Sequence, residues 1–155
     1  MKPNAQIAKK EVILIIDHDA ETSLERERKL LELLPTVEVI STSSALEGIG
    51  FCRDKSPRFV IINFDMPGFN GMIICSIVRQ MKVCEQLMMY VCFDTDSNRS
   101  DRLSLAYQVG FDCCFTKGKD EENILGSIKR YYEKKKALTE YFDDVERLRR
   151  DQEKM

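Results

Sequence analysis

Short apolar runs alternate with amphipathic segments five times along the chain. Runs that are apolar throughout are typical of strands buried on both faces of a parallel sheet, because a strand with one solvated face alternates apolar and polar residues. The amphipathic segments carry apolar residues at helical spacing, and several end at proline or glycine. The pattern predicts strands at residues 11–16, 37–41, 59–64, 87–93 and 113–116, and helices at residues 22–34, 44–53, 72–82, 100–109 and from 121 onward.

This alternation predicts an α/β fold in which right-handed crossovers join the strands of a doubly wound parallel sheet. We expect an N-terminal tail over residues 1–9, one domain over residues 10–134, and a helical extension over residues 135–155. The last predicted helix carries a heptad pattern with spacings of four and three residues, which is typical of a coiled coil. Its members are Ile124, Ile128, Tyr131, Lys135, Leu138, Phe142 and Val145.

Composition narrows the choice of function. The 155 residues include 24 Lys and Arg against 26 Asp and Glu, for a net charge of −2. This near-neutral balance argues against nucleic acid as the main partner. There is neither an apolar segment long enough to span a bilayer nor a signal-peptide pattern, so we expect a cytoplasmic protein without membrane insertion. The six cysteines form no zinc or redox motif, and we expect them to be reduced and structural.

Polar residues gather where the predicted strands end. In an open parallel sheet, ligand sites form outside the carboxyl ends of the strands. Acids, a hydroxyl and a lysine at this edge suit a hard cation and a phosphoryl group. The residues are Asp17, His18 and Asp19 after the first strand, Asn63 and Asp65 around the end of the third, Asp94 and Thr95 after the fourth, and Lys117 after the fifth.

Over about residues 10–134, the sequence resembles the receiver domain of bacterial two-component response regulators. The resemblance rests on VILIIDHD in the first strand, FVIINFDMPGFNG around the third, the turn at residues 109–112, and Lys117. It implies a flavodoxin-like (βα)5 fold with strand order 2-1-3-4-5. In that family, an acidic pair and a third-strand aspartate bind Mg²⁺, and this aspartate accepts a phosphoryl group from a histidine kinase. A Ser or Thr and a lysine then contact the phosphoryl group.

The residues at the positions that the family uses for phosphoryl transfer depart from its pattern. Counting back from the Met-Pro of the loop places Asn63 at the phosphoacceptor position, and an amide cannot form an acyl phosphate. Asp17 matches the first member of the acidic pair, but His18 occupies the second, and a neutral imidazole is a poor ligand for a hard cation. Asp19 matches a third acid that is frequent in the family. The resemblance therefore implies a degenerate receiver whose Mg²⁺ site is lost.

Three further positions bear on the switch mechanism of the family. Counting back from Gly110 puts Thr95 at the position of the Ser or Thr that contacts the phosphoryl group. Strand length would place this hydroxyl position nearer residues 92–94. Cys114 stands where the family has a mobile aromatic residue. Gly118 replaces the proline that usually follows the lysine.

We therefore expect a non-enzymatic signalling module that acts through protein–protein interaction, without cofactors and independently of phosphorylation. Expected partners are a histidine kinase, a regulator or an output domain. A homodimer could form through the face of the fourth and fifth helices or through the C-terminal helix, where Ile128, Tyr131, Leu138, Phe142 and Val145 are the candidate contacts.

Three alternatives remain open. The chain could be a divergent receiver that is phosphorylated, with Mg²⁺, on Asp65 or Asp19. It could also be the N-terminal part of a larger regulator with an output domain. A flavodoxin-like enzyme or cofactor binder is disfavoured, because the acidic loop at residues 17–19 would repel the phosphate of a flavin nucleotide.

Overall fold

The computed structural model describes residues 10–154, and in it strands and helices alternate as the sequence predicts. A short 3₁₀ helix, η1 (Lys82–Cys84), is the one addition to the predicted order. The strands are β1 (Val12–Ile16), β2 (Glu38–Thr42), β3 (Phe59–Asn63), β4 (Met88–Phe93) and β5 (Cys113–Thr116), and the helices are α1 (Ala20–Leu33), α2 (Ala45–Lys55), α3 (Gly71–Arg79), α4 (Arg99–Val109) and α5 (Glu121–Glu153).

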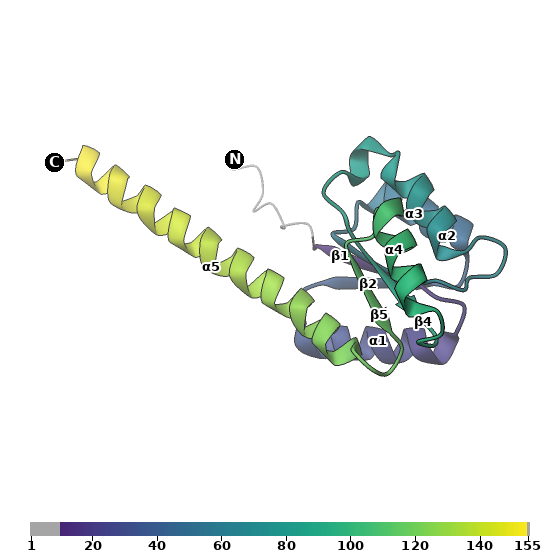
Figure 1. Cartoon of the computed structure of the whole chain (residues 1–155). Helices are drawn as coiled ribbons and strands as arrows, with labels where there is room; N and C mark the ends of the chain where they lie inside the picture. Colours follow the sequence, from purple (N-terminus) through teal and green to yellow (C-terminus); the bar gives the residue numbers. More distant parts are fainter. Residues whose placement is uncertain (1–9, 155) are drawn as a thin grey trace. The chain divides into compact units, whose positions relative to one another are not determined.

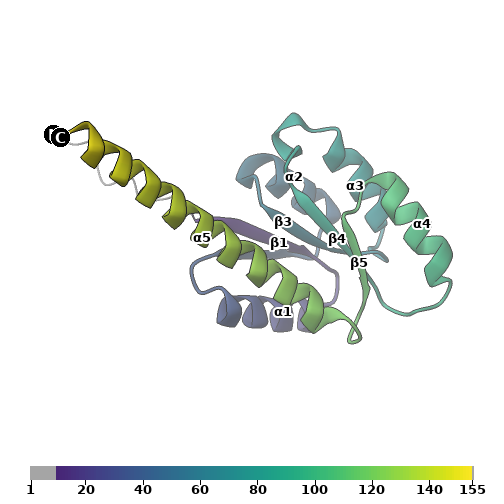
Figure 2. The ribbon, with the colours of Figure 1, turned by 60° about the vertical axis from the view of Figure 1, so that its left-hand side comes forward.

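The strands form one parallel sheet in the order β2-β1-β3-β4-β5, which confirms the predicted fold class and topology. Helix α1 covers one face of the sheet, and α2, α3 and α4 cover the other (Figures 1 and 2). All five residues of β1 and of β3 are buried, as expected for central strands of a sheet covered on both faces.

Capping residues explain why several helices begin earlier than the apolar pattern suggests. The carboxylate of Asp19 accepts hydrogen bonds from two backbone N–H groups of the first turn, so α1 begins at Ala20. Asn70 caps α3 in the same way, and this helix begins at Gly71. Gly110 follows α4 with a φ of +123°, a conformation that favours glycine.

Side chains of successive strand residues point to opposite faces of the sheet, and this alternation divides the core. Leu14, Ile62 and Val91 belong to the main apolar cluster with residues of α2, α3 and α4. The intervening residues face α1. By the same alternation, three polar residues at the strand ends also point to the face covered by α1. They are Asn63, the last residue of β3, and Asp17 and Asp94, which directly follow β1 and β4.

Helix α5 is continuous over 33 residues. By its internal contacts the chain divides into two compact units, one reaching to Glu121 and the other starting at Glu122. Every described residue of α5 from 133 onward is exposed to solvent. Within residues 10–154, no helix combines the length and the apolar character that a bilayer span would require.

Candidate functional site

The side chain of Asn63 lies at the centre of the polar residues at the carboxyl edge of the sheet. Its amide nitrogen donates to Asp17 Oδ1 and to Asp94 Oδ1, both at 3.2 Å. Its amide oxygen accepts the backbone N–H of Asp65 at 2.9 Å. The amide therefore bridges the acids that follow β1 and β4, and its only oxygen turns toward the backbone of the following loop.

Asp17 is almost completely buried, and both of its oxygens are engaged. Oδ1 accepts the backbone N–H of Asp19 at 2.9 Å in addition to the Asn63 amide. Oδ2 accepts from Nη1 of Arg26 at 3.0 Å. His18, whose place in the family pattern is acidic, is exposed, and its Nδ1 lies 3.8 Å from Asp17 Oδ1.

Arg26 is a buried cation directly behind Asp17, and its side chain, like that of Asp17, is only 1% exposed. It donates from Nη2 to Cys92 Sγ at 3.0 Å and from Nε to Glu121 Oε1. The guanidinium carbon lies 5.5 Å from the ring centroid of Phe115. Burial disfavours its charge, but the acceptors around it prevail, and the pKa of Arg26 is raised. We call Asp17, Arg26, Asn63, Cys92, Asp94 and Glu121 the inner network.

Arg26 was not among the residues predicted for the site, although the sequence carries a signal for it. Thr22, Arg26 and Leu30 recur every four residues on α1, and all three are buried. A charged residue on the core-facing stripe of a helix requires buried partners, because an isolated buried charge is costly. Its partners come from the loop after β1, from β4 and from the start of α5, so only the folded chain brings them together.

Lys117, to which the resemblance assigns a contact with the phosphoryl group, forms an ion pair with Asp19. Its Nζ lies 3.2 Å from Asp19 Oδ2. The backbone N–H of Thr22, then Lys117, lower the pKa of Asp19 to about 2. The Asp19 carboxylate in turn raises the pKa of Lys117. The lysine charge is therefore compensated across the loops that follow β1 and β5.

The structure places Asp94, and not Thr95, beside Asn63. Asn63 pairs with Cys92 in the sheet, and the alternation of side chains then turns Asp94 toward the Asn63 amide. Thr95 is exposed, and its hydroxyl accepts the backbone N–H of Ser97 at 3.4 Å. Strand length places the family's hydroxyl position near residues 92–94. At the end of that range the structure has the carboxylate of Asp94.

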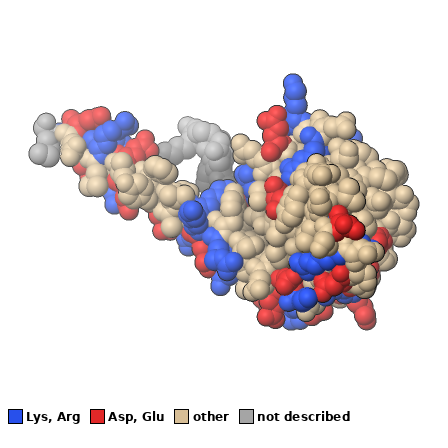
Figure 3. All heavy atoms as spheres, viewed as in Figure 1, with Lys and Arg blue, Asp and Glu red and all other residues tan. Residues whose placement is uncertain are grey.

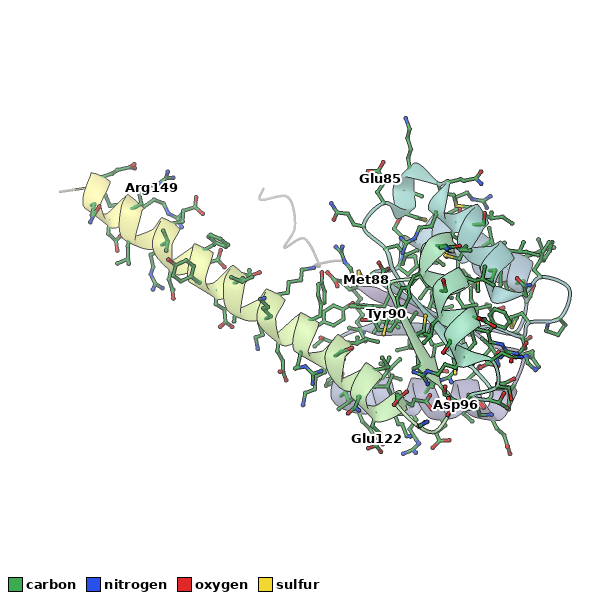
Figure 4. All side chains as sticks on the ribbon, in the orientation of Figure 1. Glu85, Met88, Tyr90, Asp96, Glu122 and Arg149 are labelled. Carbon is green, nitrogen blue, oxygen red and sulfur yellow. The ribbon has the colours of Figure 1, made fainter. Side chains whose placement is uncertain are left out.

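A second polar cluster joins the loop after β4 to the loop after β5. The Thr116 hydroxyl donates to Asp96 Oδ1 at 2.6 Å and accepts from Arg99 Nη1 at 2.6 Å. Arg99 also lies 3.3 Å from Asp120 Oδ2, and Lys119 Nζ lies 2.7 Å from Asp96 Oδ2. Hydrogen bonds from Lys119, Thr116 and Arg99 hold the pKa of Asp96 far below its usual value. We call these five residues the outer network; Asp96 is labelled in Figure 4.

The side chains at the other predicted positions are not part of the inner network. Cys114 is buried on β5, and burial raises the pKa of its thiol to about 11. Asp65 is exposed in the loop after β3. Gly118 has a φ of +75°, which proline cannot adopt, so the loop after β5 requires a residue other than proline here. On α5, Ile128 is fully buried, Tyr131 is half-buried, and Leu138, Phe142 and Val145 are exposed.

The inner network does not fit a divalent cation. Mg²⁺ takes oxygen ligands, usually carboxylates, whereas the Asn63 side chain turns N–H groups toward both neighbouring acids. Arg26 already supplies a positive charge to Asp17. Within residues 10–154, no group of three or more His, Cys, Asp or Glu side chains is placed to hold a metal ion.

Comparisons with known proteins identify the family of the chain. The model of the response regulator receiver domain matches residues 13–129, and the chain therefore belongs to this family. As a receiver domain of two-component systems, it is a signalling module and not an enzyme. Receiver domains interact with kinases and with output domains. No curated protein matches the chain.

Solved structures of receiver domains share the fold. The signal receiver domain of a DNA-binding response regulator from Colwellia psychrerythraea 34H is 21% identical, with a TM-score of 0.72 over 80% of this chain and 99% of that one. A CheY-like receiver domain protein from Methanospirillum hungatei JF-1 is 18% identical, with a TM-score of 0.65 over 83% and 98% of the two chains. The phosphorylated cyanobacterial phytochrome response regulator RcpA is 14% identical, with a TM-score of 0.63 over 80% and 92%.

Proposed function

We propose that this receiver domain is a degenerate one that signals without phosphorylation, by presenting a fixed surface to other proteins of a two-component pathway. The observation that carries the proposal is the position of the Asn63 amide, 3.2 Å from both Asp17 and Asp94. Asn63 stands where the family has its phosphoacceptor aspartate, and it acts here as a hydrogen-bond donor between two acids.

The chemistry of the amide supports the loss of phosphoryl transfer. An acyl phosphate forms when a carboxylate oxygen attacks the phosphorus atom, and the carboxylate supplies both the electron pair and the negative charge. The amide of Asn63 has neither at its nitrogen, and its oxygen is engaged by the Asp65 backbone. Asp17, the nearest buried carboxylate, accepts three hydrogen bonds and is paired with Arg26.

The buried charge of Arg26 supports the loss of the metal-dependent step. In the family a cation balances the acids of the pocket, whereas in this chain a guanidinium compensates Asp17 from inside the domain. A cation bound at the same acids would lie close to Arg26 and would be repelled by it. In the inner network, the Arg26 guanidinium therefore supplies the positive charge that the metal ion supplies in the family.

The outer network supports a surface that is fixed in one conformation. The Thr116 hydroxyl is engaged by both Asp96 and Arg99, which hold the loop after β4 against the end of β5. Leu105 and Tyr107 remain exposed on α4 and are available for contact with a partner.

The proposed partners are other signalling proteins: a histidine kinase, a regulator or an output domain. A cytoplasmic setting without nucleic-acid or membrane contacts agrees with the near-neutral charge of the chain. A homodimer through the face of α4 and α5, or through the C-terminal helix, belongs to the same proposal.

Incubation with a small-molecule phosphodonor and Mg²⁺, followed by intact-mass measurement, tests this function. We expect the mass of the wild-type protein to stay unchanged. A receiver domain that retains its aspartate serves as the positive control for the reagent. The gain of one phosphoryl group by the wild-type chain would refute the proposal.

One alternative has a specific observation in its favour, because Asp65 is an exposed carboxylate two residues after Asn63. If Asp65 accepted the phosphoryl group, the wild-type protein would be labelled and the Asp65→Ala variant would not. Labelling that survives in Asp65→Ala and is lost in Asp19→Ala would point to Asp19. Absence of labelling in the wild type would exclude both alternatives.

A further inference from the structure

The outer part of α5 carries a stripe of large apolar side chains that are exposed to solvent. Acidic and basic side chains are interspersed with uncharged ones along this helix (Figure 3). A stripe of this kind on a helix is unusual unless another surface covers it. The stripe consists of five residues that are each 46–63% exposed: Leu138, Tyr141, Phe142, Val145 and Leu148.

The spacing of the stripe defines a heptad register. Leu138, Tyr141, Val145 and Leu148 follow one another at intervals of three, four and three residues, which places them at positions a, d, a and d. The heptad pattern read from the sequence places Phe142 and Val145 at a and d, and its next a position is then Arg149. The first register is the better one for this part of α5, because it keeps the charge out of the seam.

We propose that this seam binds a second copy of the same chain in a parallel, two-stranded coiled coil. The flanking charges favour this occupant, because Asp144 lies at position g and Arg149 at position e. In a parallel dimer, residue g of one helix faces residue e five positions further along the other. Asp144 of each copy would therefore face Arg149 of the other, forming two symmetric ion pairs. Arg149 is labelled in Figure 4.

The antiparallel arrangement of the same seam brings like charges together. Pairing Leu138 with Leu148 of the other copy places position g opposite g and position e opposite e. Asp144 would then face its own counterpart, and Lys135 would face Arg149. Within the seam, from Leu138 to Arg149, the charge pattern favours the parallel orientation, although Arg130 and Lys135 at the preceding g and e positions repel each other in it.

The length of the seam sets the strength expected for the dimer. The apolar register continues over two heptads and ends where Lys134 occupies position d. Ala137 at position g of one helix faces Phe142 at position e of the other, and this pair adds apolar contact beside the seam. A coiled coil this short is marginal, so we expect a reversible equilibrium between monomer and dimer that shifts with protein concentration.

This inference names a partner within the interaction role proposed above, but its test does not depend on phosphorylation. Sedimentation equilibrium of the full chain should show a mass that rises toward twice that of the monomer as concentration increases. The variant Val145→Glu/Leu148→Glu should remain monomeric, while Thr139→Glu, which adds a charge outside the seam, should still dimerise. A wild-type monomer at all concentrations, a dimer in the seam variant, or loss of the dimer in Thr139→Glu would overturn the proposal.

A charge-reversal series tests the orientation. Arg149→Asp should weaken a parallel dimer by about tenfold, because it places acids opposite each other at two symmetric sites. The double variant Asp144→Arg/Arg149→Asp restores opposite charges and should recover the wild-type dissociation constant. In an antiparallel dimer, Arg149→Asp would instead pair with Lys135 and strengthen association, and that result would overturn the parallel arrangement.

Discussion

The inner and outer networks use the same kinds of groups in different surroundings. Each joins carboxylates to one arginine and places a hydroxyl or a thiol beside it. In the inner network the side chains of Arg26 and Asp17 are each 1% exposed. In the outer network the side chains of Arg99 and Asp96 are 30% and 42% exposed. The two networks therefore differ mainly in their access to water.

This difference determines what each network contributes to the molecule. Buried charges pay a large desolvation cost, so removal of one partner leaves an uncompensated charge in the interior. Exposed ion pairs are screened by water and salt and contribute little individually. We therefore expect the inner network to contribute most to the stability of the site, whereas the outer network holds two loops in position and contributes less.

Substitution of Arg26 should have the largest effect on stability. In Arg26→Leu, Asp17 and Glu121 lose their buried cation, and we expect the free energy of unfolding to fall by about 3–5 kcal/mol. Urea unfolding at neutral pH measures this change. Arg28 lies on the same helix but its side chain is 62% exposed, so Arg28→Leu is the matched control and should change stability by less than about 0.5 kcal/mol. Equal effects of the two substitutions would show that burial of the arginine does not determine its contribution to stability.

Substitution of Asn63 should convert a stabilising donor into a third acid. Asn63→Asp places a carboxylate beside Asp17 and Asp94, which raises the pKa of the new group above that of an unfolded aspartate. The resulting loss of stability, about 1–3 kcal/mol, should be present above the raised pKa and should disappear as pH falls through it toward the unfolded value.

Thermal unfolding of Asn63→Asp across pH measures this effect, and Asn70→Asp at the exposed start of α3 is its control. Asp and Asn are equivalent helix caps, so the control should show little change. A variant at position 63 that is as stable at pH 8 as at pH 5 would show that the Asn63 amide is not needed between the two acids.

Removal of Arg99 should have a smaller effect. Arg99→Ala breaks contacts to Asp96, Thr116 and Asp120, but we expect a stability loss of at most about 1 kcal/mol, reduced further by added salt. Denaturant unfolding at low and high ionic strength checks both statements. A loss as large as that of Arg26→Leu would mean that solvent exposure does not explain how much each network contributes to stability.

The smallest effect concerns the pH dependence of the outer network. The folded pKa of Asp96 is lowered, so its contribution is present above the unfolded value of 3.8 and is lost only as pH falls through the lower folded value. Amide signals of residues 95–98 in an NMR pH titration should therefore stay unchanged until pH is well below 3.8. A transition centred near the ordinary aspartate pKa would show that Asp96 is not held by Lys119, Thr116 and Arg99.

The sequence predicts the fold of this chain better than its site, for physical reasons. The central strands are apolar at every position, and caps such as Asn70 and Gly110 mark helix ends locally. The third helix is the exception, since it ends at Arg79 and not at Lys82. Met81 has an extended backbone there, and the chain continues into η1. The pattern of apolar residues does not predict such a short irregular turn, because the turn is too short to show a period of its own.

The site depends on contacts between elements that lie far apart in the sequence. Asn63 could be identified from its motif, because its distance from Met66 is fixed by the loop. The spacing of Thr22, Arg26 and Leu30 indicates that Arg26 faces the core, but it does not assign Arg26 to the site, because its partners come from other elements. The choice between Asp94 and Thr95 depends on the register of β4 against β3, which counting along the chain does not fix.

Binding of beryllofluoride, a phosphoryl analogue, in the presence of Mg²⁺ is the sharpest test of whether this domain has lost its phosphoryl site, because equilibrium binding does not depend on the rate of phosphoryl transfer. Titration calorimetry together with amide NMR signals around Asn63 and Lys117 gives the readout. If the proposed function is right, we expect no saturable heat and no shift of these signals, because in that proposal the Asn63 amide and Arg26 take the places of the acceptor and of the metal charge. Saturable binding, with shifts centred on residues 17, 63 and 117, would contradict it.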